Sequence, residues 1–299
     1  MPAASAEFPI GDTLAGGAWR VTEHLRGTGS QQLHLATRAD RPDARALVST
    51  IWAPRGAPGA ELLEKLGYRL PGVLELVHLG PFDPSGDELR RTHQRQHVAL
   101  VERLPDGRGA DAGSEWLPRL VSGPLGPRAA VELGRSVGAI LARAADAGPL
   151  LVGVRPEYIW ATRDGDQLRA TGLSGRNWEL FAHTGGGCLV PGRLFERHYY
   201  APEVYRERGE GPESLVFTLA AMIAEWATGQ YPFPDSWAGG NMQSLCEGRH
   251  APLDLRPPMA DLLGLCLDAE PAHRPSLPYL LRRLELLSRS APADAENTE

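Results

Sequence analysis

The segment 214–229, SLVFTLAAMIAEWATG, is apolar on nearly every side and limits how this chain can fold more than any other feature. A helix that is hydrophobic all round has to be surrounded by other elements of the protein. Two further helices are predicted in the segment 257–288. A long amphipathic helix begins near Ala129, where apolar residues recur at helical spacing at Leu133, Val137, Ile140, Leu141 and Ala144. The sequence therefore predicts a lobe of helices packed around the segment 214–229.

The first third of the chain has a different pattern, in which strand-length runs are separated by turn residues. Three runs lie between Trp19 and Trp52, namely WRVTEHL, QLHLAT and ALVSTIW, and two more occupy the segments 73–80 and 97–104. A short helix is predicted over residues 59–69, because apolar residues recur there at helical spacing. This region therefore predicts an antiparallel sheet of five strands with one helix.

The segment 105–126 is rich in Gly, Pro and Asp, and we expect it to be a hinge and linker. Further along, an Asp164-Gly165 turn predicts a hairpin, because this dipeptide accepts the positive φ angles of two-residue turns. The expected organisation, in chain order, is an N-terminal tail (1–14), a sheet lobe (15–104), the hinge and linker (105–126), a helical lobe (127–288) and a disordered tail (289–299).

Composition and charge exclude several classes of function. The chain of 299 residues has a formal net charge of -6 and no dense block of Lys or Arg, so we expect neither nucleic acid nor a membrane surface as a partner. No apolar run approaches the roughly 18–20 residues of a membrane span, and we expect a cytoplasmic protein. The three cysteines, Cys188, Cys246 and Cys266, have neither a disulfide nor a zinc-binding spacing.

Three segments carry a resemblance to a known family. Residues 199–233, YYAPEVYRERGEGPESLVFTLAAMIAEWATGQYPF, resemble the protein-kinase segment from the APE motif through the following helix. Residues 155–160, RPEYIW, are similar to the KPENIL part of the kinase catalytic loop. Residues 266–284 resemble the closing element of the family, in which an arginine pairs with the APE glutamate. The resemblance implies that Glu203 and Arg274 form a structural pair.

The resemblance also implies an architecture. It is the α+β, bilobal protein kinase-like fold of the bacterial Ser/Thr type, with a small antiparallel five-stranded sheet lobe carrying one helix and a larger, mainly helical lobe. The strand and helix patterns of the two halves agree with this architecture in order along the chain.

The residues that perform phosphoryl transfer in this family are replaced here. The reaction needs metal ions on the phosphates, a lysine and a carboxylate that orients the nucleophile. The resemblance places Gly153 at the catalytic aspartate, Tyr158 at the metal-binding asparagine and Gly172-Leu173-Ser174 at the DFG motif. The strand lysine falls on Ser49 or Thr50, depending on one residue of alignment. The only lysine, Lys65, and the expected helix glutamate, Glu61, lie on the helix predicted after that strand.

The nucleotide pocket of the family is altered as well. The glycine-rich loop keeps Gly27 and Gly29 but has no third glycine. Trp160 stands at the small residue below adenine, and Leu47 or Val48 stands at the alanine above it, so we expect side chains to fill the cleft. Two alternatives stay open for Trp160, which are an outward orientation and stacking on a ligand.

These replacements predict a pseudokinase that is not an enzyme, with no cofactor and no metal. It would act as an interaction scaffold or allosteric regulator whose partner is another protein. One alternative is a kinase-fold enzyme with a rearranged site, which recruits carboxylates such as Glu157, Asp164 or Asp166. Another is a switch that binds a nucleotide without transferring phosphate.

Overall fold

The computed structural model divides the chain into two compact units. Unit 1 comprises residues 1–112 and 174–179, and unit 2 comprises residues 113–173 and 180–299. Residues whose positions are described lie in the following ranges: 10–28, 31–54, 72–81, 95–105, 113–147, 154–174, 199–206, 211–233 and 243–290. The helix predicted over residues 59–69 lies outside the described residues.

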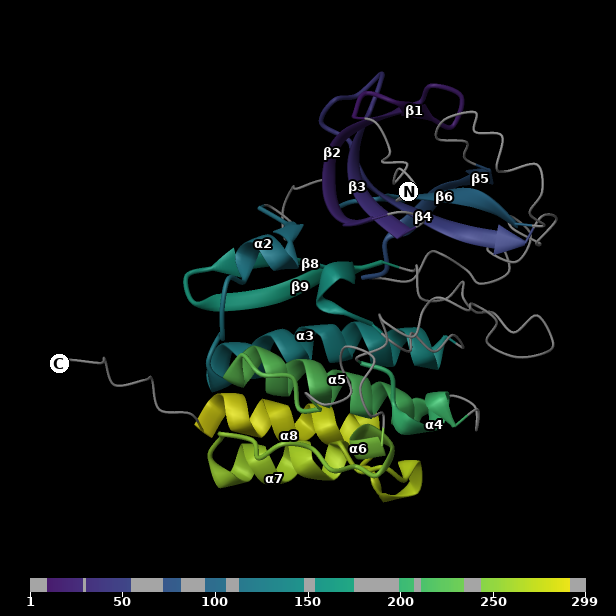
Figure 1. Cartoon of the computed structure of the whole chain (residues 1–299). Coiled ribbons are helices and arrows are strands. Elements are labelled where there is room, and N and C mark those ends of the chain that lie inside the picture. Colours follow the sequence, from purple (N-terminus) through teal and green to yellow (C-terminus); the bar gives the residue numbers. More distant parts are fainter. Residues whose placement is uncertain are drawn as a thin grey trace. The chain divides into compact units, whose positions relative to one another are not determined.

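Unit 1 contains an antiparallel sheet of six strands in the order β1-β2-β3-β4-β6-β5 (Figure 1). Its strands are β1 (Thr13–Leu14), β2 (Trp19–Thr28), β3 (Gln31–Arg38), β4 (Arg45–Pro54), β5 (Glu75–Pro81) and β6 (Arg95–Arg103). Five of them match the five predicted strands, and the sixth is the two-residue β1. The prediction missed β1 because two residues are too short to show an alternating pattern.

The register of β4 separates two sets of side chains in unit 1. Val48 and its partner Val101 belong to an apolar cluster that also contains Trp19 and Val21. Successive side chains of a strand point to opposite faces, so Ser49 lies on the other face of the sheet from Val48. Leu47 shares the face of Ser49 and pairs with Glu102 of β6 (Leu47↔Glu102). A serine and a glutamate therefore lie on a sheet face among buried leucines.

Unit 2 is mainly helical and has a small sheet of three strands in the order β7-β8-β9 (Figure 1). The strands are β7 (Glu115–Trp116), β8 (Ile159–Asp164) and β9 (Gln167–Leu173). The helices are α2 (Leu117–Leu120), α3 (Pro127–Asp146), α4 (Pro202–Tyr205), α5 (Pro212–Thr228), α6 (Gln243–Cys246), α7 (Pro257–Cys266) and α8 (Leu277–Ser290), with short 3-10 helices η3 (Pro156–Tyr158) and η6 (Pro271–His273). Both β7 and α2 fall in the segment 105–126 that we expect to be a linker.

Helix α5 is the centre of unit 2, as its apolar sequence requires. Its residues from Ser214 through Ala224 are all buried, and α3, α7 and α8 contact it. Gly229 ends the helix in the left-handed conformation at φ 75°, which glycine adopts without strain. Each large apolar side chain buried here stabilises the fold by about 1.5–3 kcal/mol.

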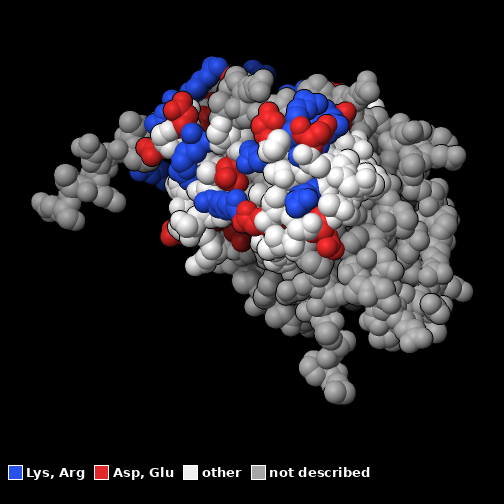
Figure 2. All heavy atoms as spheres, turned by 90° about the horizontal axis from the view of Figure 1, so that it is seen from above, with Lys and Arg blue, Asp and Glu red and all other residues white. Residues whose placement is uncertain are grey.

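Seen from above, the described residues carry positive and negative side chains interspersed with uncharged ones (Figure 2). Among the described residues, no helix is both long enough and apolar enough to cross a membrane.

Two glycines let α3 approach its neighbours closely. A Cβ atom on Gly134 would lie 2.5 Å from Ile223 of α5. A Cβ atom on Gly138 would lie 2.4 Å from Leu281 of α8 and 2.8 Å from Leu219 of α5. Both distances are shorter than a normal contact, so a methyl group at either position would force the facing Ile223, Leu219 or Leu281 side chains to shift.

We expect Gly138→Ala to lower the free energy of unfolding by about 1–2 kcal/mol, because overpacking costs more than the helix propensity that alanine gains. Gly264→Ala in α7 is the matched control, since the nearest atom to its added Cβ is His250 Nε2 at 3.7 Å. There the substitution should raise stability by roughly 0.5–1 kcal/mol. Urea unfolding followed by circular dichroism measures both variants. A stabilised Gly138→Ala protein would show that α3 does not pack as described.

Candidate functional site

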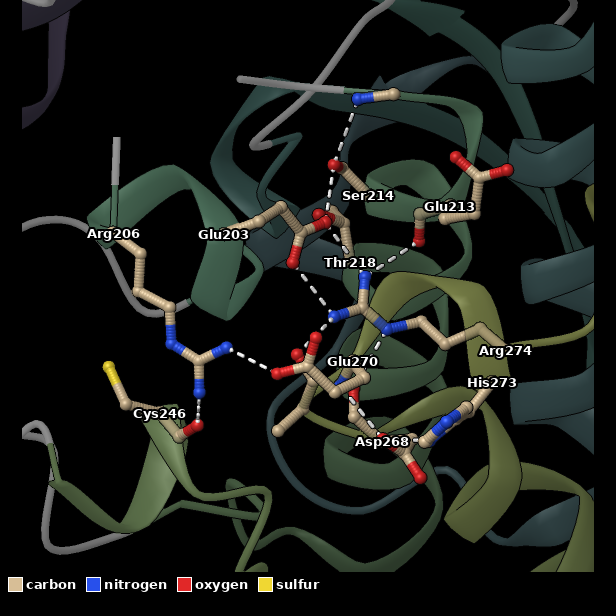
Figure 3. A network of polar contacts seen from close by, with 12 residues as sticks. Glu203, Arg206, Glu213, Ser214, Thr218, Cys246, Asp268, Glu270, His273 and Arg274 are labelled. Atoms are coloured by element: carbon tan, nitrogen blue, oxygen red, sulfur yellow. Dashed lines mark hydrogen bonds and ion pairs between the residues drawn. The ribbon is translucent and has the colours of Figure 1, made fainter. Parts of the chain in front are cut away.

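A buried ion pair joins Glu203 of α4 to Arg274, which follows η6 (Figure 3). Arg274 Nη1 donates to Glu203 Oε1 at 2.8 Å, and Arg274 Nη2 donates to Glu203 Oε2 at 2.8 Å. The side chain of Arg274 is 0% exposed and that of Glu203 is 4% exposed. Paired, parallel hydrogen bonds of this kind fix both the distance and the angle between the two groups.

The other donors of Arg274 are also used. Its Nε donates to the carbonyl oxygen of Asp268 at 2.8 Å, its Nη1 to that of Glu213 at 3.0 Å and its Nη2 to that of Ala269 at 3.4 Å. The guanidinium carbon lies 5.0 Å from the centre of the Phe217 ring. All five N–H groups of this arginine therefore have an acceptor, which a lysine could not reproduce.

Glu203 also ties down the start of α5. Ser214 Oγ donates to Glu203 Oε1 at 2.6 Å and accepts from the Gly211 backbone N–H at 3.1 Å. Burial acts to raise the pKa of Glu203, but the hydrogen bonds from Arg274 and Ser214 outweigh it and hold the pKa below its ordinary value. Glu203 is therefore a buried carboxylate that stays charged.

A second arginine extends this network toward the surface. Arg206 Nη1 donates to Glu270 Oε1 at 2.9 Å, and Arg206 Nη2 donates to the carbonyl oxygen of Cys246 (Figure 3). Glu270 is largely exposed, so this pair is weaker than the buried one. Together the two arginines connect the region of α4 to α6 and to the segment before α8.

The part of the chain that resembles the catalytic loop is held by its own contacts. Arg155 Nε lies 3.3 Å from Glu157 Oε2, and the Arg155 guanidinium lies over the Tyr158 ring. Trp116 Nε1 donates to the carbonyl oxygen of Glu157 at 3.0 Å. Tyr158, at the position of the metal-binding asparagine, is buried. Gly153 lies outside the described residues.

A buried tyrosine–glutamate contact lies in the same unit. Tyr199 donates its hydroxyl to Glu225 Oε2, and Thr218 Oγ1 donates to the carbonyl oxygen of Tyr199 at 2.6 Å. Burial raises the pKa of Glu225, and the neighbouring charge of Glu157 adds to this effect. Burial first and the charge of Glu225 second also raise the pKa of Tyr199, so its hydroxyl stays neutral.

In unit 1, Ser49 is one of the two candidate positions for the lysine, the other being Thr50. Ser49 is fully buried, and its Oγ has no hydrogen-bond partner among the described residues. Leu47 and Val48 are also fully buried. The side chain of Thr50 lies outside the described residues.

Of four further positions that the resemblance singles out, one is described. Gly27 lies within β2, whereas Gly29, Glu61 and Lys65 lie outside the described residues.

Ser174, at the last position of the DFG-like triplet, makes a contact that the sequence did not predict. Ser174 Oγ donates to Glu102 Oε2, and both residues are buried and belong to unit 1. The signal that could have found it is a glutamate on the leucine-bearing face of β6, because a buried carboxylate needs a donor. The preceding residues, Gly172 and Leu173, lie in β9.

Trp160 of β8 is fully buried, so the alternative in which it points outward to solvent is wrong. It pairs with Gly172 across the hairpin. Its indole Nε1 has no hydrogen-bond partner among the described residues, in contrast to the indole of Trp116. Whether Trp160 fills the adenine position or stacks on a ligand stays a prediction.

The described residues do not fit the divalent cation of a kinase at the expected positions. No group of three or more His, Cys, Asp or Glu side chains among them could hold a metal ion. Asp164 and Asp166 are exposed at the β8–β9 turn, and Glu157 is paired with Arg155. The carboxylates considered for a rearranged metal site are therefore not brought together in this part of the chain.

Comparisons with known proteins agree with the resemblance, although no family model matches the chain. The chain is 29% identical over 285 residues to the serine/threonine-protein kinase PknL of Mycobacterium tuberculosis, which covers 92% of the chain and 66% of PknL. It is 30% identical over 109 residues to the serine/threonine-protein kinase VIK of Arabidopsis thaliana, covering 35% of the chain and 25% of VIK. The chain thus spans a quarter to two thirds of these relatives.

Solved structures give the same fold. The PknI kinase domain of Mycobacterium tuberculosis covers 94% of the chain at a TM-score of 0.58 and 16% identity, and a double mutant of that domain gives 0.62. The expected fold, α+β and bilobal with a sheet lobe and a helical lobe, is therefore confirmed. The sheet of unit 1 has six strands where five were expected.

The expectation that this chain is not an enzyme is overturned by these relatives. Proteins named serine/threonine-protein kinases match it over 92% of its length, which points to an enzyme, although at only 29% identity. The physical reason for the error lies in how kinases work. Phosphoryl transfer depends mainly on positioning and electrostatic stabilisation. Replacement of the usual motif residues is therefore not sufficient to predict that a chain is not an enzyme.

We expect Arg274→Ala to lower the free energy of unfolding by about 3–5 kcal/mol, because it leaves the Glu203 carboxylate buried without its partner. Arg274→Lys should recover little of this loss, since an ammonium cannot make the bidentate contact. Arg206→Ala, which removes an exposed ion pair and a hydrogen bond to the Cys246 carbonyl oxygen, is the control and should cost about 1–2 kcal/mol. Equal losses for Arg274→Ala and Arg206→Ala in denaturant unfolding would contradict this assignment.

The ion pair between Glu203 and Arg274 also predicts how the stability of the folded protein changes with pH. The pKa of Glu203 is below its ordinary value of 4.5, so this residue takes up a proton less readily in the folded protein than in the unfolded chain. The contribution of Glu203 to stability is complete when the pH is above the pKa of the unfolded chain. It is lost as the pH falls through the lower pKa of the folded protein. Unfolding measured from pH 6 downward should therefore show a smaller acid-dependent loss in Glu203→Gln than in the wild type.

Proposed function

Because the chain has the protein kinase-like fold and is homologous to serine/threonine-protein kinases, we propose that it binds a nucleotide and transfers phosphate through a rearranged site. The support from similarity is the match to PknL over 92% of the chain. The acceptor would be a hydroxyl group on a protein, in line with the names of these relatives. The usual metal and phosphate contacts would be supplied by residues other than those of the common motifs.

Two unpaired buried donors carry this proposal. Ser49 Oγ in unit 1 and Trp160 Nε1 in unit 2 are buried and lack an acceptor among the described residues. An unsatisfied buried donor costs about 1–3 kcal/mol, and native proteins keep few of them. The resemblance aligns Ser49 or Thr50 with the phosphate contact and Trp160 with the adenine contact. A nucleotide supplies acceptor atoms of the kind that each of these donors lacks.

The two residues would act differently from their counterparts. The hydroxyl of Ser49 is a neutral donor, so it would bind a phosphate oxygen without the charge that a lysine brings. Trp160 would offer an aromatic face to the base and one N–H donor. The described residues do not fit a metal ion, so the roles of Ser49 and Trp160 are limited to binding and orienting the nucleotide.

We expect ATP, ADP or GTP to raise the thermal midpoint of the protein. A ligand at a hundredfold excess over its Kd adds about 2.7 kcal/mol of stability. Ser49→Ala should leave the free protein as stable or slightly more stable, and should reduce the nucleotide-induced shift. Differential scanning fluorimetry measures both effects.

Ser136→Ala is the matched control for Ser49→Ala. Ser136 Oγ donates to the Leu133 carbonyl oxygen and accepts from the Ala170 N–H, so its loss should lower the stability of the free protein and leave the nucleotide shift unchanged. Absence of any shift with all three nucleotides would refute the nucleotide-binding part of the proposal.

Transfer is tested separately with labelled ATP or GTP and Mg²⁺ or Mn²⁺. Label should appear on serine or threonine of the protein itself or of an added protein substrate, and Trp160→Phe should slow the reaction. A thermal shift without any transfer would leave a nucleotide-binding switch and would rule out the transferase.

A second candidate function is a regulatory role through binding another protein. It is supported by the replacements at the metal-ligand positions, where Tyr158 and Gly172 provide no carboxylate or amide oxygen from a side chain. This role is compatible with nucleotide binding, because a bound nucleotide can bias which partner surface is presented. Partner binding that changes with nucleotide would support both functions together.

A further inference from the structure

The outward face of α8 has an unusual composition for a surface helix. Tyr279, Arg282, Arg283 and Leu286 are all exposed, and their spacing of i, i+3, i+4 and i+7 places them on one side of the helix. We call these four residues the α8 face. The opposite side of the helix is buried at Leu277, Leu280 and Leu284, so the helix is already packed and its outward face is not part of the core.

Large exposed apolar side chains are concentrated at this end of the chain. Among the described residues there are four of them, namely Ile10, Leu265, Tyr279 and Leu286. Tyr279 is 49% exposed and Leu286 is 46% exposed, and Leu265 lies on α7, which contacts α8. A single exposed apolar residue needs no explanation, but two on one face of one helix beside charged groups do.

Within the described part of the chain, the two arginines of the α8 face have no acidic partner. Neither Arg282 nor Arg283 forms an ion pair with any residue that the structure describes, whereas Arg289 in the following turns is paired with Glu285. The chain as a whole has a net charge of -6, so two unpaired positive charges here run against its average.

Tyrosine and arginine together are typical of protein–protein contacts. Aromatic residues and arginine are enriched at interfaces, and they supply most of the residues whose loss weakens binding strongly. The α8 face combines one tyrosine, two arginines and one leucine within two turns of helix. The apolar side chains, Tyr279 and Leu286, lie at the two ends of the α8 face, and the charged side chains lie between them. This composition is typical of a protein-binding surface.

We propose that the α8 face binds an acidic, amphipathic segment of another protein, whose carboxylates pair with Arg282 and Arg283 and whose apolar side chains cover Tyr279 and Leu286. The inference does not depend on nucleotide binding or transfer. A membrane surface fits less well, because lipid-binding clusters use about 4–8 basic residues and the net charge of this chain repels anionic lipid. A second copy of the chain is an outcome that the experiment separates.

The test uses the full chain and a fluorescein-labelled helical peptide with Glu on one face and Leu on the other. Fluorescence anisotropy should show saturable binding to the wild type, and a peptide with Lys in place of Glu should bind at least tenfold more weakly. The double variant Arg282→Glu/Arg283→Glu should lose tenfold or more in affinity, and Tyr279→Ser/Leu286→Ser should lose a similar amount.

Arg128→Glu is the matched control, since Arg128 is exposed near the start of α3 and has no ion pair among the described residues. It should bind the acidic peptide within twofold of the wild type, and all variants should keep the wild-type thermal midpoint. Equal binding of the two peptides, or equal weakening by Arg128→Glu and by the Arg282/Arg283 double variant, would overturn the proposal. So would a dimer that the double variant dissociates, or binding to phosphatidylserine vesicles in preference to the peptide.

Discussion

The buried contact between Glu203 and Arg274 sets the arrangement of much of unit 2. Removing two charges from water costs several kcal/mol for each, so a pair of this kind is stable only when every donor and acceptor is satisfied. Here the remaining donors of the arginine reach backbone carbonyl oxygens at Glu213, Asp268 and Ala269. The start of α5, the segment before α8 and α4 are therefore all held by one side chain, and a shift of any of them would break a hydrogen bond of Arg274.

Part of this structure can be read from the sequence because it depends on local patterns. Strand-length runs between turn residues predicted the five longer strands, and the apolar segment 214–229 predicted the central helix α5. The pairing of Glu203 with Arg274 followed from a resemblance in sequence motifs. The two-residue strand β1 and the short elements β7 and α2 could not be predicted, because they have too few residues for a periodic signal.

Contacts between distant residues were harder to predict. The hydroxyl of Ser174 reaches Glu102 across 72 positions of sequence, and no local pattern pairs a serine after one strand with a glutamate inside another. The acceptors of Arg274 are backbone atoms, which any residue type provides, so the sequence contains no mark of them. Likewise, Trp160 could be expected to be buried, but the lack of an acceptor for its indole depends on the positions of its neighbours.

The hydrogen bond between Ser174 and Glu102 joins two separate stretches of the sequence within unit 1. The chain leaves unit 1 after residue 112, builds the strands β7, β8 and β9 of unit 2, and returns to unit 1 for residues 174–179. Unit 1 is therefore assembled from two pieces of sequence, and a fragment that ends near residue 112 would contain Glu102 without the hydroxyl of Ser174. A single cut of the chain therefore cannot separate unit 1 whole from unit 2.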